Sequence, residues 1–238
     1  MTPETQPKRF YKTATVEKLD GAYAVLLDGR GVKTPDRKPL TAPTHAVADL
    51  IAKEWNDQGD TIDHVSMPAT RYANLILDRA PGARDGMAEE LVRYGQTDLL
   101  CHLADHPSSL RMRQEAVWAP IRAWADETYG VRLEPVEGVI ATAQPPASLL
   151  ALKAVATGLD DWRLTLATAS APIFSSALLA VALDAGRLSA DQAFNASILD
   201  ETFQAEQWGW DEEAEARLSQ LRDEIGLIAR IRGALDQP

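Results

Sequence analysis

The sequence LTLATASAPIFSSALLAVAL, residues 164–183, contains no charged side chain. Its length is that of a membrane crossing, since a transmembrane helix takes about twenty apolar residues. Ser and Thr side chains dilute its hydrophobic character, Pro172 lies near its middle, and Arg163 and Asp184 flank it directly. We therefore expect a central buried helix, apolar on all sides, and no stable membrane insertion. A membrane-associated scaffold built on this segment is the alternative interpretation.

Length and composition are those of a globular protein. The 238 residues are 45% hydrophobic and 25% charged, enough for one large domain or two smaller ones. The formal net charge of −11 argues against nucleic-acid binding, which requires a basic surface. The single cysteine, Cys101, excludes an internal disulfide and suits a reducing compartment. Because the N-terminal sequence lacks the apolar segment of a signal peptide, we expect a bacterial cytoplasmic protein.

Strand-forming residues are concentrated between residues 10 and 34. Asp20-Gly21 and Asp28-Gly29 are typical of two-residue hairpin turns, and they predict a three-stranded meander. Gly29-Arg30-Gly31 lacks the spacing and the Lys-Ser/Thr ending of a phosphate-binding loop. The region is also basic, opposite in sign to the C-terminal end, through Lys8, Arg9, Lys12, Arg30, Lys33, Arg37 and Lys38.

Helical patterns follow this β region. We expect Thr41 to cap a first helix, residues 62–67 to be extended, and a second helix to begin near Pro68. Pro81-Gly82 is the best candidate for a linker, because both residues disfavour a continuous helix.

The sequence beyond this linker has helical periodicity almost throughout. A helix from Ser108 or Ser109 is expected to bend or break at Pro120 and to end at Gly130. Ser189 and Gln192 predict a capping box. The last helix has an apolar seam formed by Leu218, Leu221, Ile225 and Ile228.

These patterns predict the fold class and the domains. We expect an α+β protein with a small N-terminal β-rich domain, a hairpin or meander with one or two helices, at residues 8–80. A larger all-α helical bundle domain is expected at residues 81–236.

The segment LDETFQAEQWGWDEEAE, residues 199–215, combines seven acidic residues with Phe203, Trp208 and Trp210 and contains no Lys or Arg. Large aromatic side chains surrounded by charge of one sign are typical of a surface that captures another protein. In the alternative interpretation, Trp208 closes one helix into the core. The acids Asp211, Glu212 and Glu213 then cap the next helix, because carboxylates are favoured in a first helical turn.

A metal site is the competing functional hypothesis. His102 and His106 are four residues apart, a spacing that could place two ligands on one helix face of a small metal-dependent enzyme. However, Pro107 follows directly, and the Glu of a zinc-protease motif is missing. Cys101 and His102 would diverge on a helix, so a nucleophile–base pair is not expected.

Short blocks spread along the chain resemble one protein family. They resemble the family of assembly chaperones for the catalytic head of the F-type ATP synthase, the member devoted to the alpha subunit (assembly factor two in mitochondria). The resemblance covers roughly residues 9–235. The blocks are Phe10-Tyr11-Lys12, Leu27-Asp28-Gly29-Arg30 with Lys33-Thr34-Pro35, Glu54-Trp55-Asn56 with Gln58, Ile62 with Met67-Pro68, Asn74 with Asp78, Tyr94 with Thr97-Asp98, Gln114 with Trp118, Pro120 and Trp124, and Glu201 with Phe203-Gln204 and Trp208-Gly209.

The resemblance implies a chaperone without catalytic residues, cofactor or metal. It implies that the chain binds the unassembled alpha subunit until the beta subunit replaces it, and that the free protein is a monomer. Eukaryotic relatives would act in the mitochondrial matrix. The family's key acidic position falls on Glu201 or on Glu212. The partner-binding residues that follow from the segment and the resemblance are Glu201, Phe203, Gln204, Trp208, Trp210, Glu212 and Glu213.

Overall fold

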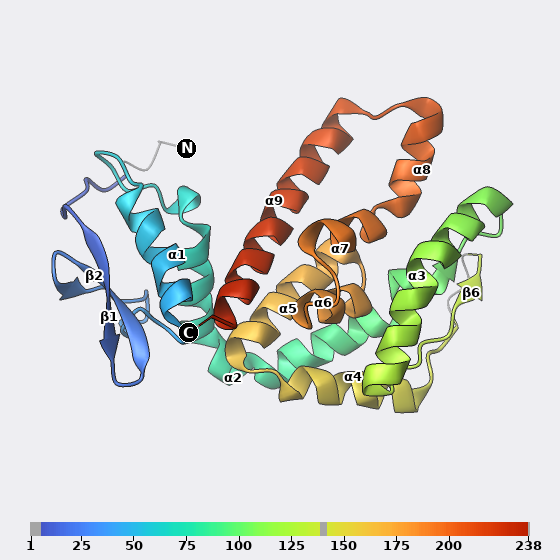
Figure 1. Cartoon of the computed structure of the whole chain (residues 1–238), viewed down its shortest axis with the longest axis horizontal. Helices are drawn as coiled ribbons and strands as arrows, with labels where there is room; N and C mark the ends of the chain where they lie inside the picture. The colour runs from blue at the N-terminus through green and yellow to red at the C-terminus, as the bar shows by residue number, and fades with distance from the viewer. Residues whose placement is uncertain (1–5, 139–141, 238) are drawn as a thin grey trace. The chain divides into compact units, whose positions relative to one another are not determined.

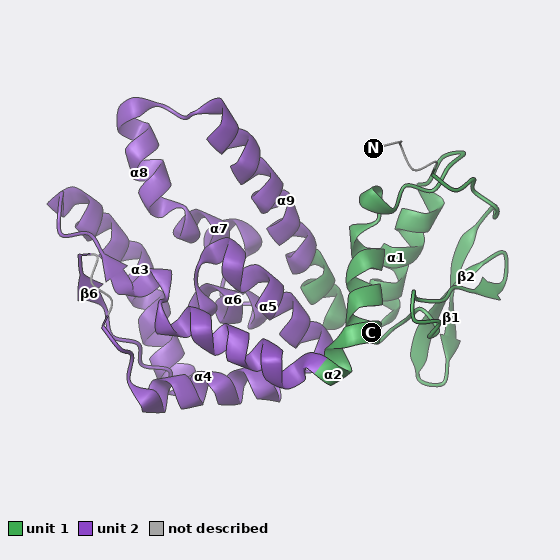
Figure 2. Ribbon diagram, turned by 180° about the vertical axis from the view of Figure 1, so that it is seen from behind, with its two compact units in different colours: residues 1–82, 230–238 green, residues 83–229 purple. Residues whose placement is uncertain are grey.

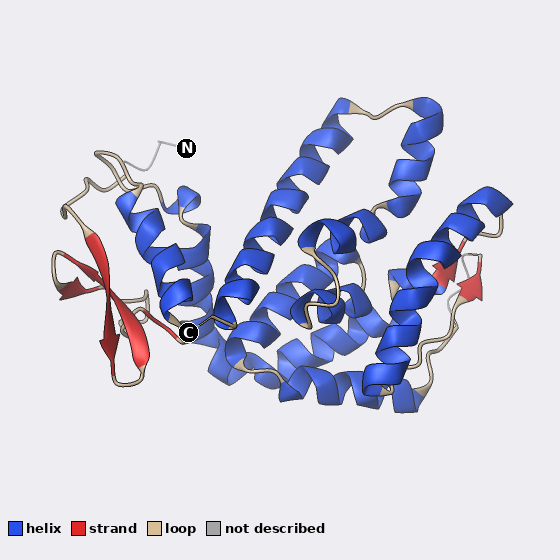
Figure 3. Ribbon diagram, in the orientation of Figure 1, coloured by secondary structure: helices blue, strands red, loops and turns tan. Residues whose placement is uncertain are grey.

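The structure is a computed structural model that describes residues 6–138 and 142–237. It divides into two compact units, one of residues 1–82 with 230–238 and one of residues 83–229 (Figure 2). The strands of the main sheet belong to unit 1, and unit 2 is mostly helical (Figure 3). The α+β fold class is confirmed. The expected domain ranges, 8–80 and 81–236, assign residues 230–236 to the helical part, whereas their contacts are with unit 1.

A small antiparallel sheet forms the β part of unit 1. Strands β1 (Ala14–Leu19) and β2 (Ala22–Leu27) pair from Ala14↔Leu27 to Leu19↔Ala22. The two predicted hairpin turns are confirmed, because Asp20, Gly21, Asp28 and Gly29 all have positive φ angles. Two-residue strands complete the sheet. The sequence predicts the third strand of the meander at residues 32–34, whereas β3 (Arg30–Gly31) lies two residues earlier, and β4 (Thr41–Ala42) also pairs with β2.

The predicted start of the first helix is wrong by three residues. Thr41 lies in β4, and Thr44 is the N-cap of α1 (His45–Asn56), accepting a hydrogen bond from the Val47 amide at 3.2 Å. The segment expected to be extended contains a 3-10 turn, η1 (His64–Ser66), capped by the Asp63 side chain.

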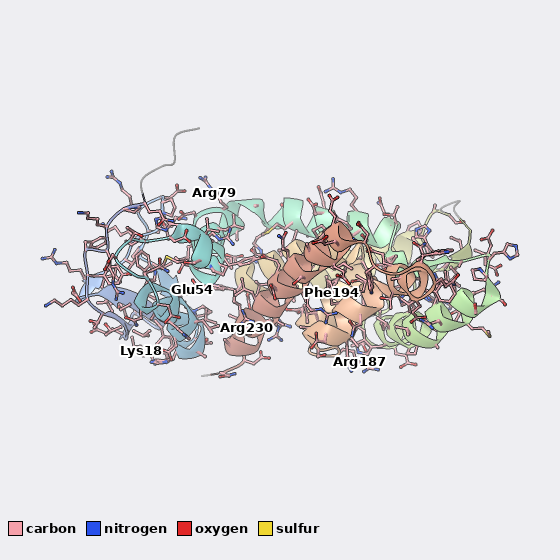
Figure 4. All side chains as sticks on the ribbon, turned by 90° about the horizontal axis from the view of Figure 1, so that it is seen from above. Lys18, Glu54, Arg79, Arg187, Phe194 and Arg230 are labelled. Atoms are coloured by element: carbon pink, nitrogen blue, oxygen red, sulfur yellow. The ribbon has the colours of Figure 1, made fainter. Side chains whose placement is uncertain are left out.

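Side chains on α1 fasten the sheet and the following helix. Asn56 exchanges two hydrogen bonds with the backbone of Ala14, at 2.8 and 2.9 Å. The carboxylate of Glu54, labelled in Figure 4, accepts from the Ala69 and Thr70 amides at 2.6 and 2.8 Å. These amides lie in the first turn of α2 (Pro68–Gln96), where they have no partner within the helix. The Glu54-Trp55-Asn56 block therefore holds unit 1 together.

The predicted linker at Pro81-Gly82 is not a break in secondary structure. Both residues lie inside α2, which runs through them. A proline within a helix leaves the carbonyl four residues earlier without its usual donor. Here that carbonyl belongs to Leu77, and the Lys38 ammonium donates to it at 2.6 Å. A side chain from the β region thus replaces the missing hydrogen bond.

Unit 2 is built from helices with one short pair of parallel strands (Figure 1). The core includes Trp118, whose indole N–H donates to the Ala196 carbonyl at 2.9 Å. Gly130 ends α3, Pro120 does not break it, and the Ser189–Gln192 capping box is present. After η2 (Leu99–Cys101) the elements are β5 (His102–Leu103), α3 (Ser108–Tyr129), β6 (Val136–Glu137), α4 (Pro146–Gly158), α5 (Asp161–Phe174), α6 (Ala177–Asp184), α7 (Ala190–Ser197), α8 (Leu199–Trp208) and α9 (Glu212–Leu235).

The uncharged segment at residues 164–183 is buried as expected, but it forms two helices instead of one. Ser175 adopts a left-handed conformation with φ 50°, which ends α5, and the Ser176 side chain caps α6 by accepting from the Leu179 amide at 3.0 Å. Among the described residues, no helix meets the length and hydropathy required to cross a membrane.

A fully buried carboxylate fixes this break. Asp98 accepts from the Leu100 amide at 3.1 Å, the Ser176 hydroxyl at 2.7 Å and the Leu178 amide at 3.0 Å. Two of these donors lie at the start of α6, where a negative charge is favoured. Burial nevertheless raises the pKa of Asp98 to about 6, because the charged form has lost its hydration.

This raised pKa predicts a pH-dependent stability. The folded chain binds the Asp98 proton more tightly than the unfolded chain, so the free energy of unfolding is larger below pH about 4. It falls as the pH rises to about 6, by about 3 kcal/mol for this group. Urea unfolding of the wild type and of Asp98→Asn between pH 4 and 7 measures this. The free energy of unfolding of the wild type, relative to that of the variant, should increase as the pH falls. A difference that stays constant with pH would contradict the prediction.

Candidate partner-binding surface

The acidic and aromatic segment forms the end of a helical hairpin in unit 2, which we call the α8–α9 tip (residues 201–215). Helix α8 ends at Trp208 because Gly209 takes a φ of 80°, and the Gly209 amide donates to the Ala205 carbonyl at 2.8 Å. After a short turn, the Asp211 side chain accepts from the Ala214 amide at 3.3 Å in the first turn of α9. Figure 1 shows this turn joining the outer ends of α8 and α9.

The two tryptophans of the tip are in solvent. Trp208 is 78% exposed and Trp210 is 40% exposed. Closure of Trp208 into the core is therefore wrong, although capping of the next helix by Asp211 is confirmed. Gln204 is exposed, and Phe203 is partly covered by the Arg113 guanidinium, 5.2 Å from its ring centre. Because soluble proteins seldom leave two neighbouring tryptophans in water, this pair has the character of a contact surface.

The acids of α8 are engaged within unit 2. Glu201 pairs with Arg217 of α9 at 2.7 Å, and Glu206 pairs with Arg113 of α3 at 2.7 Å. The hydrogen bond from Arg113 lowers the pKa of Glu206. Burial raises the pKa of Asp200, which accepts from the Gln114 amide nitrogen at 2.8 Å.

The acids in the first turn of α9 are different. The carboxylates of Glu212, Glu213 and Glu215 are exposed and have no ion pair or hydrogen bond within the described residues. They lie close in sequence to Trp210 and are accessible to a partner. Of the two candidates for the key acid, Glu212 is thus free and Glu201 is already paired.

A pocket of about 420 Å³ lies beside the base of the tip. Its wall includes the Glu201–Arg217 pair, Leu218 and Leu221 of α9, and Pro172 near the end of α5. Its lining combines apolar side chains with polar ones, including this ion pair, as protein interfaces do.

Three residues that position the tip were not among the predicted site residues. Gln114 is buried, donates to Asp200 and accepts from the Ala104 amide at 2.7 Å. Arg113 and Arg217 pair with the acids of α8. Gln114 belongs to a block of the family resemblance, which was a usable signal. The two arginines have no local pattern that marks them.

The residues of the metal hypothesis are not arranged as a helical ligand pair. His102 lies in β5 and His106 in the bend before α3, so the spacing of four does not place them on one helix face. Among the described residues no group of three His, Cys, Asp or Glu side chains could hold a metal ion. Burial raises the pKa of the Cys101 thiol to about 12, which suppresses the thiolate.

The known proteins to which the chain is similar include assembly chaperones. A family model described as ATP12 chaperone protein matches residues 8–126. A mitochondrial Atp12 protein of Schizosaccharomyces pombe is 23% identical over 224 residues, which make up 89% of this chain and 77% of that protein.

Three solved structures are similar to this chain over nearly its whole length. Atp12 from Paracoccus denitrificans is 37% identical with a TM-score of 0.92, covering 96% of this chain and 98% of that one. A mutant of the same organism's Atp12p, with lysine in place of an aspartate, has 36% identity and a TM-score of 0.93 over 97% and 100% of the two chains. A candidate chaperone of Agrobacterium tumefaciens has 36% identity and a TM-score of 0.89 over 97% and 87%.

The buried amide of Gln114 should be essential for the position of α8. In Gln114→Leu, the Ala104 amide and the half-buried Asp200 carboxylate both lose a partner, which should lower the free energy of unfolding by about 2–4 kcal/mol. Arg113→Ala is the matched control on the same helix, because its exposed pair with Glu206 should contribute less than about 1 kcal/mol. Urea unfolding measures both values, and amide hydrogen exchange should rise in α8 of Gln114→Leu. If both variants lose the same free energy of unfolding, the buried hydrogen bonds of Gln114 contribute no more than the exposed ion pair of Arg113.

Proposed function

The chain belongs to the ATP12 chaperone family, whose members are assembly chaperones of the ATP synthase without a catalytic role, and we propose that it binds the unassembled alpha subunit. In this proposal the chaperone keeps the alpha subunit competent for assembly until the beta subunit replaces it. The observation that carries the proposal is the pair of exposed tryptophans, Trp208 and Trp210, beside free carboxylates at the α8–α9 tip.

The tryptophans supply the anchor of the proposed contact. An unassembled subunit exposes the surface that will later face its neighbour, and such a surface is apolar enough to self-associate. Tryptophan is among the residues that contribute most when they are buried at protein interfaces. Two rings on a short turn can enter small depressions of a partner without a change in the helices that carry them.

The carboxylates supply direction and selectivity. Glu212 and Glu213 have the sign of the chain's net charge of −11, so a client surface that presents arginines or lysines is attracted to the tip and acidic surfaces are repelled. We propose that these acids stand in for negative groups that the alpha subunit meets in the assembled enzyme. A rim of exposed charge also keeps the affinity moderate, as a temporary holder requires.

The site of action follows from the same proposal. The relatives come from a mitochondrion and from bacteria, and in each case a holder of a new subunit must be where that subunit folds. For this chain we expect the bacterial cytoplasm.

Removal of the rings should abolish most capture of the alpha subunit. We expect Trp208→Ala with Trp210→Ala to weaken binding at least tenfold, because the buried part of the interface would lose its anchors. Leu150→Ala on α4 is the control, since Leu150 is an apolar residue elsewhere in unit 2 whose exposure, 68%, lies between those of the two tryptophans. Binding is measured as the amount of purified alpha subunit that the immobilised chaperone retains in a pull-down. If the double variant captures as much alpha subunit as the wild type, the tryptophans are not the anchor of the contact.

The charge contribution is tested separately. Glu212→Lys with Glu213→Lys should weaken capture and reduce its dependence on salt, because the attraction between these exposed carboxylates and a basic client surface, which salt screens, is removed. Asp126→Lys with Glu127→Lys at the end of α3 makes the same charge change away from the tip.

The role of Glu201 needs a variant that keeps its ion pair. Glu201→Arg with Arg217→Glu exchanges the two charges across the 2.7 Å contact. Capture that survives this exchange but fails in Glu212→Lys would assign the key acid to the free carboxylate. If Glu201→Lys and Glu212→Lys both leave capture unchanged, the acids are only helix caps.

A further inference from the structure

Unit 1 contains a pocket of about 610 Å³ that the proposed tip contact does not use. Phe10, Arg30, Lys33 and Trp55 are part of its wall, together with residues of the hairpin between β2 and β3. Two of the blocks singled out in the sequence, at residues 10–12 and 27–33, thus meet around one cavity.

The lining residues fall into two groups by their contacts. Tyr11 donates from its hydroxyl to the Trp55 carbonyl at 2.6 Å, and the Asp28 carboxylate accepts from the Lys12 and Thr13 amides at 3.0 Å. These amide hydrogen bonds lower the pKa of Asp28. Tyr11 and Asp28 therefore hold the pocket in shape.

The second group is free to meet a ligand. Phe10 is 74% exposed. Arg30 and Lys33 are exposed, and neither side chain has an ion pair or hydrogen bond in the part of the chain that the structure describes. Trp55 contributes to the wall, although its indole N–H is buried and has no acceptor among the described residues.

Charge separates this pocket from the rest of the molecule. Residues 6–40 contain eight Lys and Arg against four Asp and Glu, a net charge of +4 in a chain of −11. The charged residues of the pocket wall itself are Arg30, Lys33 and Asp28, a net charge of +1, so the wall favours an anion, whereas the free carboxylates of the α8–α9 tip favour a cation.

We propose that this pocket binds an acidic extended segment of the alpha subunit, with carboxylates on Arg30 and Lys33 and an adjacent apolar side chain against Phe10. The inference rests on the proposed function, because it names a second contact with the same client. A peptide carboxylate suits the site better than a phosphate, because the Asp28 carboxylate in the wall repels a multiply charged group and the hairpin lacks a phosphate-binding loop. Opposite charges at the two surfaces mean that they take different segments of the client.

Peptides from the client test the proposal on the full-length chaperone. Overlapping fluorescein-labelled 15-residue peptides that cover the alpha subunit are titrated, and binding is followed by fluorescence anisotropy. We expect the bound set to include peptides with net negative charge and an apolar residue. Arg30→Glu with Lys33→Glu should lower the affinity for these peptides at least tenfold, and Phe10→Ala should lower it several-fold. Trp208→Ala with Trp210→Ala should leave them unchanged.

Matched controls separate the pocket from general electrostatics. Lys8→Glu with Lys18→Glu makes the same charge change in unit 1 outside the pocket wall, and it should retain at least half of the affinity. An equal loss in this control, or displacement of the peptides by ATP or inorganic phosphate at similar concentration, overturns the proposal.

Capture of the whole alpha subunit distinguishes a failure of the pocket contact from a failure of the proposed function. If wild-type chaperone captures the alpha subunit and no acidic peptide binds, the pocket contact is wrong and the proposed function stands. If the wild type captures no alpha subunit, both are wrong. A melting temperature of Arg30→Glu, Lys33→Glu within a few degrees of the wild type shows that any loss of binding is not a loss of fold.

Discussion

The base of the α8–α9 tip is held by one buried amide, that of Gln114, while Arg113 and Arg217 hold it nearer the surface. Of the residues of α8, all of which the structure describes, Leu199 alone is buried, so apolar packing contributes little to holding this helix. Gln114 supplies what packing does not, because it joins Asp200 at the base of α8 to the Ala104 amide. A buried amide has directional donors and acceptors, and it fixes an orientation that a few apolar contacts would leave loose. The helix is therefore fixed at its base and ends in solvent.

Exposed tryptophans carry a risk of self-association, and the surrounding charges counter it. Trp208 and Trp210 would be buried favourably against the same rings of a second copy. Two copies of the tip would, however, bring Glu212, Glu213 and Glu215 against their equivalents, and this repulsion opposes dimerisation. A basic surface meets no such barrier. In the proposed contact, the acids would select which proteins can cover the rings, while the rings would supply most of the free energy of binding.

Local signals in the sequence predicted those features whose causes are local. The Asp-Gly dipeptides form hairpin turns, and Gly130 and the Ser189–Gln192 pair act within one helical turn. No local signal predicts the break at Ser175, because the Asp98 carboxylate that accepts from the Ser176 hydroxyl lies 78 residues away. The dipeptide Pro81-Gly82 predicts a linker, because the donor that compensates for the proline, Lys38, is 39 residues from Leu77 and leaves no local pattern.

The same distinction applies to the candidate site. Residue types located the acidic and aromatic segment, yet the division of its acids into paired and free ones depends on distant partners. Arg113 reaches Glu206 across 93 positions and Gln114 reaches Asp200 across 86. Trp208 is the last residue of α8, and its ring is exposed because no distant side chain in the described part of the chain covers it, which the local sequence does not reveal.

Two contacts of opposite charge have a consequence for release. In the proposed arrangement, each contact alone is moderate, and their combined affinity is high because the second forms within one complex. A subunit that competes for one contact needs to displace only that part at first, after which the remaining contact dissociates quickly. A single large apolar interface of equal affinity would have to open in one step, with a correspondingly slow dissociation. Division of the binding energy between a tryptophan-bearing acidic tip and a basic pocket therefore reconciles a firm hold on an unassembled subunit with its transfer to the next partner.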